Sequence, residues 1–403
     1  MNLPSSTVGP PPDGGWVAWS QVLGGHLVVF LCWGYINTFG LFQTYYTTES
    51  SISASTSDVA WIGSMLIFLL MFIGVWSGSA SDSGYFRLTT LLGSFMFVFG
   101  VFMTSICTKF WQLILAHGIC TGLGNGLLFV PTISVVATYF SPRRKSLAIG
   151  TALTGTSVGG LIIPVMFNNL LPKIGFGWSM RAFGLLALVL SAISQCLLRQ
   201  RLPPKQAKRI LEFEALRDGL FVLFVIGAFM NFLGLYFALT FVGAYARNVL
   251  GLSFSRSINV LLVINGTGVP GRLILMWLAD QRQIRGIRPV TVYIPVSLVT
   301  SLLFFVWIGV HDLRGLYIFA AFYGFFGGGL QSLYNASLTD MALDPTKIGA
   351  QVGWGFTIDS FSMLIGNPIA GVLVQADNGR YLYAQLFAGA CTMAGFIITS
   401  EIG

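Results

Sequence analysis

The sequence has 403 residues, of which 55% are hydrophobic and only 9% are charged, and its formal net charge is +8. Soluble proteins carry about 25% charged residues, so this composition excludes an ordinary soluble domain and indicates a membrane protein. Because the Lys and Arg residues lie mostly between apolar stretches, we interpret the positive charge as a feature of membrane topology and not of nucleic-acid binding.

Twelve apolar stretches, each close to the length of about 20 residues that a transmembrane helix needs, follow one another along the chain. Glycines interrupt them, without the alternation of polar and apolar residues that a β-barrel requires. We therefore predict an all-α integral membrane protein with twelve transmembrane helices. The predicted spans are residues 17–42, 59–79, 88–107, 111–138, 147–171, 182–198, 219–244, 257–279, 290–310, 316–338, 348–375 and 382–400.

Small residues and thiols within these spans are expected to serve packing. Many of the 48 glycines fall inside the spans, where small residues let helix backbones approach closely in lipid. The 5 cysteines are scattered without paired spacing, so we expect reduced, packed thiols and neither a disulfide framework nor a metal site. No cofactor motif is present in the sequence, and none of the spans clusters the groups that a membrane enzyme would need.

The basic residues of the connectors predict the orientation. Connectors that follow even-numbered spans carry most of the Lys and Arg residues outside the spans, which places both termini in the cytoplasm. The longest and most charged connector is residues 199–218, and it divides the chain evenly. We predict a cytoplasmic segment at 1–16, six-helix halves at 17–198 and 219–403, and a cytoplasmic linker at 199–218. The plasma membrane is the expected location, because the sequence shows no retention signal.

Two motifs at corresponding places in the topology point to a family. Residues 12–19 read Pro-Asp-Gly-Gly-Trp-Val-Ala-Trp before the first span, and residues 139–150 read Tyr-Phe-x-x-Arg-Arg-x-x-Leu-Ala-x-Gly before the fifth. Both resemble signatures of the monocarboxylate porter family of major facilitator transporters, and residues 34–42 look most like its fungal branch. The resemblance implies two six-helix halves, alternating access around a central cavity, and an organic acid or related small solute as cargo, commonly moved with a proton.

The motif residues also have physical roles of their own. Asp13 and the two glycines after it form a tight turn, and its side chain is able to cap the first helix. Arg143 and Arg144 are predicted to engage helix-end carbonyls or Asp82 and so latch the cytoplasmic side, although topology alone also explains their charge. The residues expected to gate the conformational change at the cytoplasmic side are Asp13, Asp82, Arg87, Arg143, Arg144 and Asp280.

Four ionisable residues lie within spans, where each is costly in lipid and suggests a function. Arg272 has the fixed charge and planar fork that suit a carboxylate, and we expect it to bind an anionic cargo. Asp359 is predicted to carry the coupling proton and to pair with Arg272, since the eighth and eleventh helices are neighbours in the facilitator fold. His26 and His117 are either further proton sites or polar groups satisfied within the bundle.

The expected cargo site is rich in aromatic and amide side chains, which suits a larger and partly aromatic solute. The substrate-binding residues that we predict are Arg272, Tyr35, Asn37, Asn125, Tyr334 and Asn335. Further candidates for the cavity wall are Phe39, Phe129, Asn231, Tyr236, Tyr323 and Gln331.

Departures from the family leave several cargoes open. Animal lactate carriers place a Lys midway along the first helix and an Asp one turn before the Arg of the eighth, whereas this sequence has no Lys before Lys109 and has Gly268 at the second place. Export of a fungal secondary metabolite and transport of a riboflavin-like vitamin therefore remain alternatives. A solute sensor that does not transport is a third, although such proteins usually have a long cytoplasmic tail, and this sequence ends soon after its last predicted span.

Overall fold

The computed structural model describes residues 9–48, 55–141, 144–202, 217–279, 288–341 and 348–402, and within these ranges the regular structure is helical. The helices of the first half of the chain are α1 (Gly15–Asn37), α2 (Phe39–Thr48), α3 (Thr56–Ala80), η1 (Ser81–Tyr85), α4 (Phe86–Thr104), α5 (Phe110–Leu113), η2 (Ile114–Cys120), α6 (Thr121–Thr138), α7 (Lys145–Leu153) and α8 (Gly155–Leu197). Those of the second half are α9 (Gly219–Asn248), α10 (Phe254–Ala279), α12 (Pro289–Ile308), α13 (Leu313–Asp340), α14 (Ile348–Ala376) and α15 (Leu382–Ser400).

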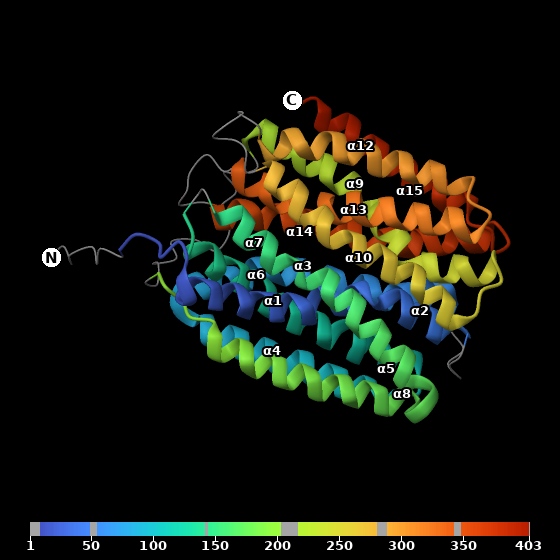
Figure 1. The fold of residues 1–403 in the computed structure, drawn as a ribbon, viewed down its shortest axis with the longest axis horizontal. Coiled ribbons are helices and arrows are strands. Elements are labelled where there is room, and N and C mark those ends of the chain that lie inside the picture. The colour runs from blue at the N-terminus through green and yellow to red at the C-terminus, as the bar shows by residue number, and fades with distance from the viewer. Residues whose placement is uncertain are drawn as a thin grey trace.

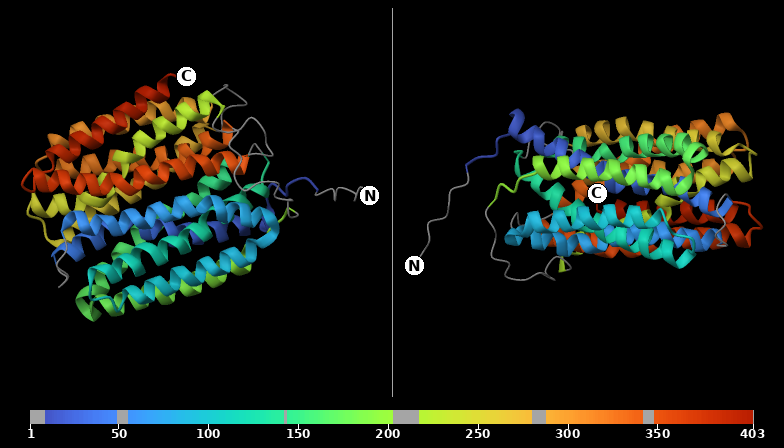
Figure 2. Two further views of the ribbon diagram at one scale, coloured as in Figure 1. Left: turned by 180° about the vertical axis from the view of Figure 1, so that it is seen from behind. Right: turned by 90° about the horizontal axis from the view of Figure 1, so that it is seen from below.

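The long helices run side by side and form one bundle. Helices α1 to α8 lie on one side of it and helices α9 to α15 on the other, as Figures 1 and 2 show. The two groups meet where α3 packs against α14 and where α10 packs against α8. We call the end of the bundle at which α1 begins and α8 ends the linker end, and the opposite end the far end.

The described residues contain 11 helices that are long and apolar enough to cross a membrane, where the sequence predicted twelve. The difference arises at residues Leu147–Leu197, which count as one segment of 51 residues. The backbone is not helical at Gly175, where φ is +72° and ψ is 173°, so two helices are joined there by a sharp break. In Figure 1 the chain reverses direction within α8, so that α7 with the first arm of α8 corresponds to the predicted fifth span and the second arm to the predicted sixth.

Glycines bring helices of the bundle into close contact. A Cβ atom added to Gly34 of α1 would lie 2.6 Å from the Cα of Gly159 in α8, and one added to Gly271 of α10 would lie 2.1 Å from the carbonyl oxygen of Phe325 in α13. Such distances are shorter than a Cβ atom tolerates, so these helix pairs require a residue without a side chain. The expected packing role of the glycines is confirmed at these two contacts.

Candidate functional site

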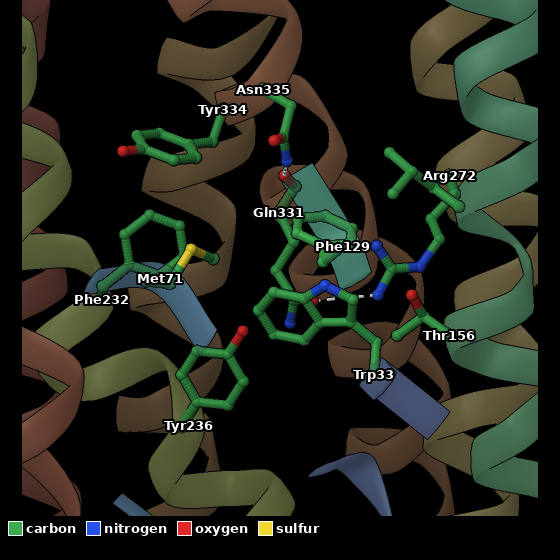
Figure 3. Close-up of a pocket in the computed structure, with 11 residues that line it drawn as sticks. Trp33, Met71, Phe129, Thr156, Phe232, Tyr236, Arg272, Gln331, Tyr334 and Asn335 are labelled. Atoms are coloured by element: carbon green, nitrogen blue, oxygen red, sulfur yellow. Dashed lines mark hydrogen bonds between the residues drawn. The ribbon is translucent and has the colours of Figure 1, made fainter. Parts of the chain in front are cut away.

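A small cavity lies inside the bundle, between its two sides (Figure 3). Helices α1, α3, α6, α7 and α8 form one wall, and α9, α10 and α13 form the other. The lining residues are Trp33, Met71, Phe129, Leu153, Thr156, Phe232, Tyr236, Arg272, Gln331, Tyr334 and Asn335. Its volume, measured as the space open to the centre of a water molecule, is about 20 Å3. Since a water molecule needs about 10–15 Å3 of such space, the cavity has room for about one.

The two sides of the bundle are in contact beyond the cavity in both directions along the helices. At the far end α2 packs on α9, where a Cβ atom on Gly40 would lie 2.6 Å from the carbonyl oxygen of Leu239. At the linker end α7 packs on α10, where a Cβ atom on Gly150 would lie 3.7 Å from that of Met276. In this conformation the cavity has no room for a molecule much larger than water.

Arg272 is the one charged residue among those that line the cavity. It is 4% exposed, and among the described residues its guanidinium donates to neutral groups: Nη2 to Oε1 of Gln331 at 2.9 Å, Nη1 to Oγ of Ser332 at 3.1 Å, and Nε to Oγ of Ser157 at 3.4 Å. Figure 3 shows this side chain reaching into the cavity beside Gln331. Within the described residues no acidic side chain pairs with it. A buried cation without a counter-ion is unfavourable, and an anion in the cavity would compensate it.

Asp359 lies in the middle of α14 and is fully buried, with neither carboxyl oxygen making a hydrogen bond. It is not among the cavity-lining residues, and the predicted ion pair between Arg272 and Asp359 is absent from this conformation. The reason is directional, since Arg272 points to serine and glutamine side chains of α8 and α13. A charged carboxylate without a partner is costly in such surroundings, which favours the neutral acid.

The other predicted substrate-binding residues divide into two groups. Tyr334 and Asn335 line the cavity with Arg272. Tyr35 instead stacks on the ring of Phe183, with ring centroids 5.2 Å apart, and lies away from the cavity lining. The side-chain amide of Asn37 donates to Oδ1 of Asn265 at 3.1 Å and so links α1 to α10.

Asn125 is fully buried, its amide has no hydrogen-bond partner, and it does not line the cavity. Of the further candidates, Phe129, Tyr236 and Gln331 line the cavity, whereas Phe39, Asn231 and Tyr323 do not. The residues that the sequence analysis did not select for the cavity wall are Trp33, Met71, Leu153, Thr156 and Phe232.

The two histidines within spans have polar neighbours. Nδ1 of His26 lies 3.3 Å from Oγ1 of Thr154 and 3.4 Å from the carbonyl oxygen of Thr151. Nδ1 of His117 lies 3.0 Å from the hydroxyl of Tyr46, while its Nε2 has no hydrogen-bond partner. Neither histidine lines the cavity, so the arrangement favours a role inside the first group of helices.

At the linker end the two sequence motifs meet. The backbone N–H of Asp13 donates to the carbonyl oxygen of Tyr139 at 3.1 Å, and the N–H of Ser141 donates to Oδ1 of Asp13 at 2.7 Å. Nη1 of Arg144 donates to the carbonyl oxygen of Asp13 at 2.8 Å. The expected cap of the first helix by Asp13 is wrong, because α1 has Gly14 as its N-cap and no side-chain cap bond. Asp13 instead links the segment before α1 to the segment between α6 and α7 through these hydrogen bonds.

The remaining residues predicted to control this end are only partly described. Arg143 and Asp280, together with the side chain of Asp82, lie outside the described residues. Arg87 is described and donates from Nη1 to the carbonyl oxygen of Gln195, near the end of α8. This bond joins two helices of the same side of the bundle.

Removal of the Asp13 side chain should weaken the contact between these two segments, because the hydrogen bond from Ser141 is lost. Hydrogen bonds from Ser141, and to a smaller extent the charge of Arg144, lower the pKa of the Asp13 carboxyl. The contact is therefore present above the ordinary pKa of about 3.9 and is lost only as the pH falls through the lower, folded value. We expect Asp13→Ala to raise hydrogen exchange at the amides of residue 13 and Ser141 at neutral pH, whereas wild-type protein, after correction for intrinsic rates, should lose this protection only below pH ~4.

Asp13→Asn is the matched control for this prediction. Asp13 has a positive φ of 58°, which asparagine adopts more readily than alanine, and the amide oxygen is still able to accept from Ser141. Equal protection in Asp13→Ala and wild-type protein would show that the carboxylate does not hold the segment.

A helical bundle closed around a central cavity whose wall comes from both sides is the architecture of a membrane solute transporter. The model of the Major Facilitator Superfamily matches residues 22–367, and the chain belongs to this superfamily. Its relatives are named transporters, so it is a multi-pass membrane transporter and not an enzyme.

Similar proteins are found among fungal transporters. The chain is 40% identical over 402 residues to an MFS-type transporter of Gibberella zeae, which covers 99% of this chain and 89% of that protein. It is 36% identical to the MFS-type transporter dbaD of Emericella nidulans, over 96% of this chain and 86% of that protein. It is also 34% identical to the aspyridones efflux protein apdF of the same organism, over 96% of this chain and 78% of that protein.

A solved structure shares the fold. The crystal structure of the human organic anion transporter MFSD10 superposes with a TM-score of 0.69 over 96% of this chain and 98% of that chain, at 16% sequence identity. This likeness concerns the fold alone. The three fungal names do not mention monocarboxylates, so the narrower resemblance to monocarboxylate porters remains a hypothesis.

Proposed function

We propose that this protein is a secondary active transporter that moves a small organic anion by alternating access and couples the movement to protons. The observation that carries the proposal is the buried guanidinium of Arg272, which lines the cavity between the two sides without an acidic partner among the described residues. An ionisable group in a membrane interior is energetically costly, and its presence there therefore suggests a function. A carboxylate or similar anion would form an ion pair with the guanidinium of Arg272.

Two cargo classes fit this proposal, and one has additional support. A simple monocarboxylate, as in the monocarboxylate porter family, needs little more than the cation. Aromatic rings occupy much of the cavity wall, however, in Trp33, Phe129, Phe232, Tyr236 and Tyr334. One relative is named an efflux protein for aspyridones. These observations favour export of an aromatic, anionic secondary metabolite over uptake of lactate-like acids, with a vitamin of similar shape as the remaining alternative.

The size of the cavity supports alternating access. Because a cavity of about 20 Å3 is too small for an organic solute, we propose that the two sides separate at one end at a time to admit and release cargo. We propose twelve crossings, counting the two arms of α8 separately, with six helices on each side of the linker. In this arrangement the linker end and both termini face the cytoplasm and the protein lies in the plasma membrane.

Ligand-induced stabilisation tests the binding part of this proposal. Purified protein would be heated with a panel of monocarboxylates, aromatic acids, riboflavin and neutral aromatic compounds. A ligand at 100 times its dissociation constant stabilises the folded state by about 2.7 kcal/mol. We expect aromatic acids to raise the unfolding midpoint of the wild type but not of Arg272→Ala. Stabilisation by neutral aromatics alone, equal in both proteins, would contradict an anionic cargo.

A further inference from the structure

Tyr334 stands between the cavity and the buried acid. Its ring lines the cavity, whereas Asp359 does not. In Figure 3 its hydroxyl points away from Arg272 and Gln331. The hydroxyl oxygen lies 3.3 Å from the position that a Cβ atom would take on Gly355, one helical turn before Asp359 in α14. The ring of Tyr334 therefore borders the cavity, and its hydroxyl approaches α14 one helical turn before Asp359.

The hydroxyl of Tyr334 and the carboxyl of Asp359 are both buried polar groups without a hydrogen-bond partner. The Tyr334 hydroxyl contacts α14 at Gly355, which lies four residues before Asp359, or about 6 Å of helical rise, so the two groups are near each other. Buried polar groups without partners are uncommon in proteins, and those that persist often have a functional reason.

Few other titratable groups reach this carboxyl. Helices α3, α9, α13 and α15 pack against α14. Among the described residues the titratable neighbours of Asp359 are Tyr334 of α13 and Tyr293 of α12. The hydroxyl of Tyr293 already accepts from the side-chain amide of Asn231 at 3.2 Å, and Tyr293 does not line the cavity. Tyr334 therefore offers the direct link between cavity water and Asp359.

Aromatic neighbours fix the plane of the Tyr334 ring. It stacks on Phe224, with ring centroids 6.1 Å apart and an interplanar angle of 16°, and meets Phe232 edge-on at 4.8 Å. Phe356, three residues before Asp359 in α14, has its ring centroid 5.9 Å from that of Tyr334. This packing leaves the hydroxyl as the part that is free to reorient.

We infer that the Tyr334 hydroxyl relays the coupling proton between water in the cavity and Asp359, so that cargo and proton bind on opposite sides of one tyrosine. A phenol is both donor and acceptor. Its oxygen accepts a proton from a hydronium ion in the cavity, which becomes water, while its own hydrogen passes to the carboxylate. The hydroxyl stays neutral and Asp359 becomes the acid; release is the reverse. This inference rests on the proposed proton coupling and assigns its route.

Infrared spectroscopy of the protein without cargo tests the relay. The C=O stretching band of a protonated carboxyl that Asp359→Asn lacks would identify the Asp359 acid, and its growth after a step from alkaline to neutral pH would be timed. We expect Tyr334→Phe, which keeps the ring and removes the hydroxyl, to slow this growth at least about tenfold while the final amplitude stays that of the wild type. Tyr245→Phe is the matched control, since Tyr245 is a buried tyrosine bonded to the carbonyl oxygen of Val310, and it should leave the rate unchanged.

The outcomes separate the relay from the proposed function. Equal rates in Tyr334→Phe and the wild type would overturn the relay, as would a variant that loses the final amplitude, since Tyr334 would then only shape the site. A wild type without any Asp359-dependent band would overturn the relay and the proton coupling together. Binding of organic anions is measured separately by thermal stabilisation and is unaffected by that result.

Discussion

Replacement of Arg272 by alanine is expected to abolish anion transport. Arg272 is the only cation among the described residues that line the cavity, and its partners there are neutral groups of Ser157, Gln331 and Ser332. Truncation of one member of a buried charge pair costs about 2–5 kcal/mol of binding free energy, so the affinity for the anion should fall at least about 30-fold. The measurement is uptake of labelled acid by proteoliposomes together with the dissociation constant of the purified protein.

The stability of the same variant distinguishes binding from a structural role. If the guanidinium served a structural ion pair, its loss would leave a buried acid unpaired and lower the unfolding midpoint. Because no acid among the described residues pairs with Arg272, we expect Arg272→Ala to be at least as stable as the wild type. Arg272→Lys keeps the charge and loses the planar fork, and it should retain part of the affinity. A strongly destabilised alanine variant would contradict the assigned role.

Replacement of Asp359 by asparagine should uncouple transport from the pH gradient. The amide has nearly the shape of the neutral acid but does not take up or release a proton. We therefore expect Asp359→Asn to lose accumulation driven by an imposed pH gradient, while exchange of labelled for unlabelled acid at equal pH continues at a rate near that of the wild type. Exchange returns the carrier with cargo bound and so does not require deprotonation of the empty form.

The two assays must be made on the same proteoliposomes. Loss of both activities would indicate a folding or binding defect, and ligand-induced stabilisation of Asp359→Asn would show whether the site is intact. An Asp359→Asn variant that retains pH-driven accumulation would place the proton elsewhere, and His26 and His117 would then be the next groups to replace.

Sequence reasoning selected the buried ionisable residues of the helices, of which Arg272 lines the cavity and Asp359 does not. Arg272 and Asp359 were found because a charge within an apolar span is costly and therefore conspicuous. Trp33, Met71 and Phe232 were missed, because aromatic and apolar side chains occur equally on lipid-facing and cavity-facing sides of a span. A helix that is apolar all round does not reveal in its pattern which side faces inward. For the same reason Tyr35 and Asn125 were assigned to the cavity although they pack elsewhere.

The positions of the helices could be predicted from the sequence, whereas the details of their connections could not. The positions of the long helices follow from runs of about 20 apolar residues, and most predicted spans coincide with described helices. The break at Gly175 occupies few residues, so that Leu147–Leu197 reads as one segment where the sequence suggested a longer connector. The contact of Asp13 with Ser141 joins segments more than 120 residues apart, and helix-end patterns contain no information about such a pairing.

The most direct test of the proposed function is transport by the purified protein in liposomes under an imposed pH gradient, with the labelled acid that best stabilises it. Wild-type protein should accumulate this acid above its external concentration while the gradient lasts, and Arg272→Ala should not. An acid that binds but does not cross the membrane, or that crosses equally well with Arg272→Ala, would contradict a proton-coupled carrier of organic anions built around Arg272.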